Sequence, residues 1–303
     1  MKRACVVLII MCMIVANNVH AKHNTGAKCL IFGVGARASG MGEAMGAVVD
    51  DASSIYWNPA GLGFIQNMQF MATHYQLYPD ISDGCYNNFM GGVMPLGKSN
   101  GVIGGGIIYF SQGTYPVMKD YDGLGVLEQT GECYARDIAG IASYGRMLGK
   151  NMAVGGGIKY IDSKLYVDYD GHAMAIDLGV LAKDVVRKGL SVGVSLTNYG
   201  NKIYYQDKPQ ADVLPLALRF GVGYRLNDEI ILACDINQQV NDKYTGINLG
   251  IEGYLMNNFI ARAGYLDKGA GLKGITYGFG VPYGRYRFDF ANAPGGELGR
   301  INK

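Results

Sequence analysis

Residues 33–63 read GVGARASGMGEAMGAVVDDASSIYWNPAGLG, and the organisation of the chain follows from this stretch. It is rich in small residues and holds an acidic pair, Asp50 and Asp51. Pro59 cannot donate to a sheet ladder and disfavours the α region for Asn58, so regular structure must break at this turn. Residues after the stretch read as short strands. The stretch therefore predicts a compact segment that leads into a large β structure.

Thirteen strand-like segments follow, each near the length that a tilted membrane-spanning strand needs. They lie at 64–75, 84–96, 101–111, 132–147, 151–162, 172–184, 189–199, 214–226, 229–239, 244–256, 258–267, 272–282 and 284–291.

Alternation of side chains is the main sign of these strands. In 216–225 the even positions read L, L, F, V and Y, whereas the odd positions read A, R, G, G and R. Successive side chains of a strand point to opposite faces, so each strand has one apolar face and one small or polar face. The pattern fits a soluble sandwich, which buries the apolar face against a second sheet, and also a membrane barrel, which turns it towards lipid.

The connections between the segments favour the barrel. Long connections such as 112–131 and 200–213 alternate along the chain with short ones such as 148–150 and 227–228. Outer-membrane barrels have long extracellular loops and short periplasmic turns, which produces this order, whereas a sandwich has no reason to keep it. We therefore expect an all-β, transmembrane antiparallel β-barrel.

Residues 35–62, GARASGMGEAMGAVVDDASSIYWNPAGL, resemble the N-terminal signature of the FadL/TodX-like outer-membrane barrels, in particular the PorV/PorQ branch and its uncharacterised relatives. In that branch a G-x-R-x-x-G-M-G segment leads through an Asp-rich stretch to W-N-P-A-G-L. The resemblance implies a fourteen-stranded barrel whose N-terminal segment folds into the barrel mouth as a hatch. The residues that carry the motif are Gly35, Arg37, Gly40, Gly42, Asp50, Asp51, Trp57, Asn58, Pro59, Ala60 and Gly61.

Three domains are expected from these features. Residues 1–21 read as a signal peptide, with a basic start, a short apolar core and a cleavage site at Val19-His20-Ala21. Residues 22–63 form the tether and hatch, and residues 64–303 form the barrel in the bacterial outer membrane. Relatives continue past a segment like Leu298-Gly299 into a closing strand, which we expect to be missing here.

Composition excludes several classes of function. Removal of the signal takes away Lys2 and Arg3 and no acidic residue, which leaves 25 basic and 25 acidic side chains and no basic footprint for nucleic acid. The histidines lack the HExxH spacing and no G-x-S-x-G elbow occurs, so we expect no enzyme, cofactor or metal site. Isolated thiols are expected at Cys29, Cys85, Cys133 and Cys234, with a Cys85–Cys133 bridge as the alternative.

The polar faces of the expected strands place nine charged side chains towards the lumen. We expect them to form ion pairs that hold the hatch, because their signs are mixed and no single sign dominates to select an ion. Arg37 and the Asp50-Asp51 pair should then meet wall charges of opposite sign, such as Asp235 or Arg262. Within the hatch, the acidic pair should hydrogen-bond backbone or an arginine such as Arg37. The nine are Lys159, Asp177, Arg219, Asp235, Glu252, Arg262, Arg285, Arg287 and Asp289.

Two functions remain open for a barrel embedded in outer-membrane lipid. By analogy with the wider superfamily, we expect a passive channel that takes up small or long-chain hydrophobic compounds. The alternative is a PorV-like barrel that docks secreted proteins or secretion-system components. A continuous apolar tunnel to the hatch would favour uptake, and a sealed, salt-bridged lumen would favour docking.

Overall fold

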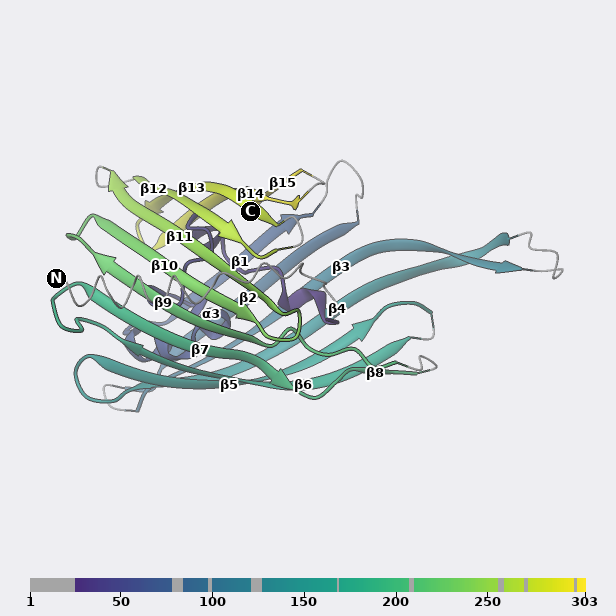
Figure 1. Cartoon of the computed structure of the whole chain (residues 1–303), viewed down its shortest axis with the longest axis horizontal. Helices are drawn as coiled ribbons and strands as arrows, with labels where there is room; N and C mark the ends of the chain where they lie inside the picture. The colour runs from purple at the N-terminus through teal and green to yellow at the C-terminus, as the bar shows by residue number, and fades with distance from the viewer. Residues whose placement is uncertain are drawn as a thin grey trace.

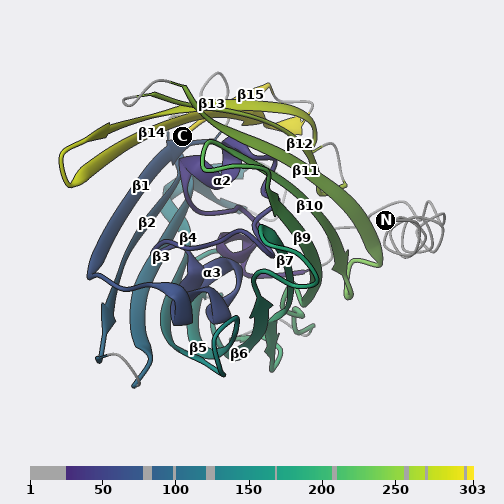
Figure 2. The same cartoon turned by 90° about the vertical axis from the view of Figure 1, so that its left-hand side faces the viewer.

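A nearly closed antiparallel β-barrel surrounds the N-terminal segment of the chain (Figures 1 and 2). The computed structural model describes residues 25–77, 84–97, 100–120, 127–167, 169–206, 210–255, 259–269, 272–296 and 299–303. The expected signal peptide lies outside these residues. No helix in the described ranges is long and apolar enough to cross a membrane.

The strands follow one another around the barrel in chain order, and each pairs with the next in antiparallel fashion; the short β8 instead pairs with β6. They are β1 (Gln69–Gln76), β2 (Cys85–Pro95), β3 (Val102–Asp120), β4 (Leu127–Met147), β5 (Met152–Lys164), β6 (Asp170–Ala182), β7 (Leu190–Gly200), β8 (Tyr204–Tyr205), β9 (Ala217–Arg225), β10 (Ile230–Gln239), β11 (Tyr244–Leu255), β12 (Phe259–Asp267), β13 (Lys273–Tyr283), β14 (Tyr286–Pro294) and β15 (Arg300–Asn302).

The N-terminal segment folds inside this ring as four short helices. They are η1 (Lys28–Leu30), α2 (Ala36–Gly40), α3 (Ser54–Trp57) and η2 (Pro59–Phe64). Figure 2 shows α2 and α3 enclosed by the strands. Nearly every described residue from Thr25 to Leu62 is buried, so the segment forms a hatch that fills the lumen.

The outer face of the barrel is apolar, the reverse of a soluble sandwich. On β6 the side chains of Met174, Ile176, Leu178 and Val180 are exposed, while the residues between them are buried. A protein in water would bury this face, whereas a barrel in a bilayer turns it towards lipid. The alternation predicted from the sequence is therefore confirmed, with the polar face inside.

The prediction of a long connection at 112–131 is wrong, because strands β3 and β4 continue through most of this range. Within the part of the chain that the structure describes, β3 beyond Gln112 pairs with β4 alone, with Thr114 opposite Tyr134 and Pro116 opposite Glu132. These two strand ends project beyond the barrel as a two-stranded ribbon (Figure 1). Both faces of the ribbon are largely solvated, so its sequence lacks the alternation that identifies the barrel strands.

Two further differences concern strand ends. The first strand begins at Gln69 rather than at residue 64, because Pro59 begins the 3₁₀ helix η2. A short strand, β15, pairs with β14 and lies beside β1, where we expected no closing strand. Among the described residues, Cys29, Cys85, Cys133 and Cys234 form no disulfide, so the alternative of a Cys85–Cys133 bridge is wrong.

Candidate functional site

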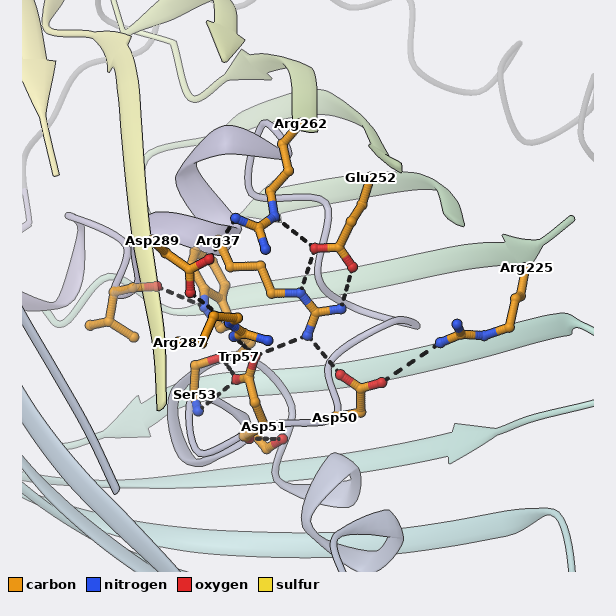
Figure 3. Close-up of polar contacts among 12 residues, drawn as sticks. Arg37, Asp50, Asp51, Ser53, Trp57, Arg225, Glu252, Arg262, Arg287 and Asp289 are labelled. Carbon is orange, nitrogen blue, oxygen red and sulfur yellow. Dashed lines mark hydrogen bonds and ion pairs between the residues drawn. The ribbon is translucent and has the colours of Figure 1, made fainter. Parts of the chain in front are cut away.

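The interface between hatch and lumen wall is the candidate site, and Arg37 on α2 is its centre (Figure 3). Its Nε and Nη2 donate to the two carboxylate oxygens of Glu252 on β11, at 2.9 and 3.0 Å. Its Nη1 donates to Asp50 at 2.6 Å and to Asp51 at 2.9 Å. Arg37 is only 4 % exposed. One guanidinium thus joins the acidic pair of the hatch to the wall through charge-assisted bonds, the stronger class of hydrogen bond.

Wall arginines complete the network around these carboxylates. Arg262 donates from Nε to Glu252 at 2.7 Å and from Nη1 to Asp289 at 2.7 Å. Arg287 donates to Asp289 at 2.8 Å and lies 3.5 Å from Asp51. Arg225 lies 3.9 Å from Asp50 at the edge of the network. Four arginines therefore balance four carboxylates, and the hatch charges Arg37, Asp50 and Asp51 each have an opposite charge of the wall beside them.

A second group of contacts holds the middle of the hatch. Arg219 on β9 donates to Asp235 at 3.0 Å and to the backbone carbonyl of Glu43 at 2.9 Å. Asp235 also accepts from the backbone N–H of Gly46 at 2.7 Å, and the Glu43 carboxylate pairs with Lys268. The wall thus binds hatch backbone as well as hatch side chains, which fixes the path of the chain through the lumen.

A third group lies in the wall near the aromatic residues of the hatch. Lys159 on β5 lies 2.7 Å from Asp177 and donates to the side chain of Asn198 at 2.6 Å. Asn198 has φ 62° at a bulge of β7 and donates its backbone N–H to Asp177 at 2.8 Å. The Lys159 ammonium lies 5.6 Å from the ring centre of Tyr56 on α3. Asp177 thus neutralises Lys159 within the wall, and the Lys159 ammonium faces the ring of Tyr56 in the hatch.

The turn that follows α3 is fixed by Asn58. Its Nδ2 donates to the carbonyl of Gly46 at 2.9 Å, and its Oδ1 accepts from the N–H of Ala60 at 3.1 Å. Pro59 occupies the first position of η2, where a missing N–H costs nothing. Trp57 donates from its indole to the carbonyl of Val34 at 3.1 Å. The W-N-P-A motif therefore ties together three parts of the hatch.

The hatch glycines allow very close approach to the wall. Gly42 has φ 60°, and a Cβ built there would lie 2.4 Å from the carbonyl oxygen of Tyr265. Gly40 lies against Arg262, and Gly61 against Ser54 within the hatch. Gly35 has φ 89° at the start of α2. A side chain at Gly42 would therefore both strain the backbone and push the hatch from the wall.

The expected contact of the acidic pair with Arg37 is confirmed, but the expected wall partners differ. Glu252, not Asp235, meets Arg37, and Arg287, not Arg262, meets Asp51. Arg285 does not face the buried lumen: it lies in the turn before β14, is exposed, and packs over the ring of Tyr286. The strand alternation from which we predicted its direction begins only at residue 286.

Two contributors escaped the sequence analysis. Glu43 lies in the motif segment, 3 % exposed, and Lys268 follows β12, 6 % exposed. Glu43 lies in a segment with no strand period, and Lys268 directly follows the strand expected at 258–267, so the alternation assigns neither side chain a direction. In the described residues no group of His, Cys, Asp or Glu side chains has the arrangement of a metal site.

Neighbouring charges shift the pKa values of two hatch carboxyl groups. Burial alone would raise the pKa of Asp51, but the nearby Arg37 and Arg287 hold it well below its usual value of 3.8. Burial would likewise raise the pKa of Glu43, but Lys268 and Lys303 lower it from 4.5. A carboxylate with a depressed pKa stabilises the folded state above its unfolded pKa and loses that contribution only as pH falls through the lower folded value.

We therefore expect the hatch to stay seated down to about pH 4, near the unfolded pKa values of Asp and Glu. The measurement is ion conductance in planar bilayers at pH 7 and pH 4, with the Asp51→Asn variant as the control for a weakened hatch. Opening of the unmodified barrel between pH 6 and pH 4 would show that these carboxylates are not held as the contacts require.

One pocket among the described residues lies between hatch and wall. Its volume is about 50 Å³, and it lies against Tyr56, Trp57, Lys159, Arg219 and Lys268, among other residues. An apolar cavity of about 150 Å³ is the size that binds benzene in an engineered protein. The pocket is thus about a third of that volume and is lined by three cations, so as it stands it does not accommodate an aromatic hydrocarbon.

Sequence comparison decides the family. The sequence model of the family described as "Type IX secretion system protein PorV" matches residues 16–241, well over half of the chain. The chain belongs to the PorV family. Curated proteins gave no match.

Solved structures place the fold of this PorV-family barrel among the FadL-type channels. The toluene transporter TodX of Pseudomonas putida superposes with a TM-score of 0.63 at 13 % identity, over 89 % of this chain and 95 % of that one. The toluene transporter TbuX of Ralstonia pickettii gives 0.60 at 12 %, over 89 % and 96 %. A FadL homologue of Pseudomonas aeruginosa gives 0.54 at 11 %, over 89 % and 94 %. At such identities the likeness establishes the outer-membrane barrel fold.

Proposed function

We propose that this PorV-family barrel is a sealed docking platform for protein secretion and not a conduit for small molecules. The observation that carries the proposal is the lumen, which is filled by a hatch whose charges are paired with the wall. Sequence reasoning favoured uptake by analogy with the superfamily. The packed lumen is the reason we prefer the alternative.

Opening a path would require breaking buried ion pairs. Arg37 donates hydrogen bonds to both carboxylate oxygens of Glu252, and Glu252 is fully buried. Separating the partners of a buried pair leaves uncompensated charge at a cost of about 3–5 kcal/mol. Glu43 of the hatch and Lys268 of the wall form a second buried pair that would have to break. Spontaneous displacement of the hatch would thus be rare, which argues against passive diffusion as the working state.

The projecting ribbon supplies a surface for docking. Beyond Gln112 on β3 and before Arg136 on β4, neither strand has an outer neighbour among the described residues, so both edges carry backbone groups outside the described ladder. Exposed edges pair readily with an extended segment of another chain. Tyr115, Leu127 and Tyr134 add exposed apolar side chains, 46, 58 and 65 % accessible. An extended segment of a secreted protein or a secretion component fits this surface.

Trimming the ribbon tests the proposal. In the bacterium that carries the chain, residues 114–134 are replaced by Asn-Gly, a pair suited to a two-residue hairpin. The control shortens the connection between β5 and β6. We expect the trimmed barrel to reach the outer membrane but to lose most secreted proteins from the medium and cell surface, as measured by mass spectrometry, while toluene uptake stays unchanged.

The opposite pattern would contradict the docking role. If the trimmed variant secretes normally, and a strain without the chain secretes normally but loses toluene uptake, the barrel is a channel. A loss of secretion in the trimmed variant is assigned to the ribbon only if the loop-shortened control secretes normally.

A further inference from the structure

A groove opens on the outer surface of the barrel wall. The hatch turn lies against the inner surface of the same part of the wall. The volume of the groove is about 520 Å³, within the roughly 300–1,000 Å³ range of small-molecule sites. It crosses strands β4 to β7, and its lining is almost wholly apolar. The side chains that line it include Tyr144, Arg146, Val154, Leu178, Val180 and Leu196.

Glycines make the groove. Gly156 on β5 lies at an outward-facing position, so the wall has no side chain there. Gly155 and Gly179 face inward beside it, and a Cβ at Gly155 would lie 2.3 Å from the backbone of Pro59. The floor of the groove is therefore strand backbone with the hatch turn directly behind it. Exposed Ile158 and Met174 on the surrounding wall place the opening in the apolar, membrane-facing band.

One end of the groove carries positive charge. Arg146 lies one residue before the end of β4 and is exposed on the outer face. Lys150, in the short turn that follows, and Lys188, in the turn after β6, are also exposed, and Asp184 is the acidic residue of these two turns. Short turns mark the periplasmic end of outer-membrane barrels, so the basic rim lies where the headgroups of the periplasmic leaflet begin. Basic side chains at that level attract anionic lipid.

We propose that the groove holds one acyl chain of a phospholipid of the periplasmic leaflet, with the lipid phosphate bound by Arg146. Guanidinium matches phosphate with two parallel N–H···O bonds, and its aliphatic stem can lie along the apolar wall while the charge reaches the interface. The acyl chain supplies the contacts that the missing side chain of Gly156 leaves unmade. The inference rests on the membrane barrel and not on the docking role.

A matched pair of glycine variants tests the groove. A Cβ at Gly156 would lie 3.4 Å from the carbonyl of Asp177 and 3.5 Å from Leu178, ordinary contact distances, so Gly156→Phe is compatible with the fold. The control is Gly253→Phe: Gly253 is a wall glycine of β11 with nothing within 4 Å of its Cβ. Arg146→Gln tests the phosphate contact separately.

The experiment is native mass spectrometry of delipidated barrel titrated with dioleoyl phosphatidylglycerol. We expect the unmodified barrel and the Gly253→Phe variant to retain one lipid through collisional removal of detergent. Retention should fall about tenfold in Gly156→Phe and severalfold in Arg146→Gln, and inorganic phosphate should not displace the lipid.

Three outcomes would overturn the proposal. Equal retention by Gly156→Phe and Gly253→Phe would mean that lipid binds the wall without using the groove. Full displacement by inorganic phosphate would mean that only the anion is recognised. No retained lipid on the unmodified barrel would leave the groove to a protein partner.

Discussion

Replacement of Glu252 by alanine is expected to destabilise the barrel by about 3–5 kcal/mol, the cost of leaving buried charge without its partner. Glu252 is fully buried and accepts hydrogen bonds from Arg37 and Arg262. Its loss leaves Arg37 with Asp50 and Asp51 and Arg262 with Asp289, so the buried network keeps four arginines for three carboxylates. Among the described residues, Arg262 already has one buried nitrogen, Nη2, without a hydrogen-bond partner. Urea unfolding in lipid vesicles, followed by tryptophan fluorescence, measures the change, because the single tryptophan, Trp57, lies in the hatch.

An exposed ion pair provides the control. Lys164 and Asp170 lie 3.6 Å apart on the outer ends of β5 and β6, with side chains 32 and 48 % accessible. Asp170→Ala should cost less than about 1 kcal/mol, because water screens an exposed pair. Similar losses for Glu252→Ala and Asp170→Ala would contradict the assignment of Glu252 as the junction between hatch and wall.

Phe220→Arg should destabilise the barrel by about 2–4 kcal/mol, the cost of an arginine facing lipid near the bilayer midplane. Phe220 is at the middle of β9 and is 36 % exposed on the outer face. Its neighbours across the two adjacent strands, Val194 and Ile236, share the apolar belt. Refolding into lipid vesicles at increasing urea gives the free-energy difference.

An arginine near the membrane surface is the matched control. Tyr283 is the last residue of β13, beside a short turn, and is 73 % exposed. Tyr283→Arg should cost about 0–1 kcal/mol, because the side chain reaches the interface. If both arginines cost the same, Phe220 does not face the centre of the bilayer.

The neighbouring position shows how the hatch changes an expectation drawn from strand pattern alone. Gly221 points inward, and the pattern predicts that Gly221→Ser is mild. That prediction is wrong, because a Cβ there would lie 2.7 Å from the backbone nitrogen of Ala47 and 2.6 Å from Asp235. Overpacking of this kind typically costs about 1–3 kcal/mol.

The barrel was predictable because its strands repeat one simple pattern. The sequence predicts a strand at 229–239, and β10 spans Ile230–Gln239. A period of two persists in such strands because one face meets lipid and the other meets the hatch. Residues 113–120 and 127–131 of the ribbon escape prediction for the opposite reason: both of their faces are largely solvated, so no alternation is selected.

Most charges of the site were predictable, as was the contact of Arg37 with the acidic pair, but the pairing of hatch with wall was not. Inward-facing positions identify Glu252 and Arg262 from the strand period, and the hatch motif contains Arg37 and the acidic pair. Arg37 and Glu252 are 215 residues apart in the chain. Their contact depends on the route of the hatch through the lumen, which is set by backbone contacts such as that between Gly46 and Asp235.

The seal itself is tested most directly by planar-bilayer conductance of the unmodified barrel and of a variant lacking residues 33–54. The deletion removes Arg37, Glu43 and the acidic pair but keeps the Asn58-Pro59 turn. We predict near-zero conductance for the unmodified barrel and a steady, open, ion-conducting lumen for the deletion variant, with its fold checked by circular dichroism. Near-zero conductance of a correctly folded deletion variant would contradict the account, because the lumen would then be closed by something other than the hatch.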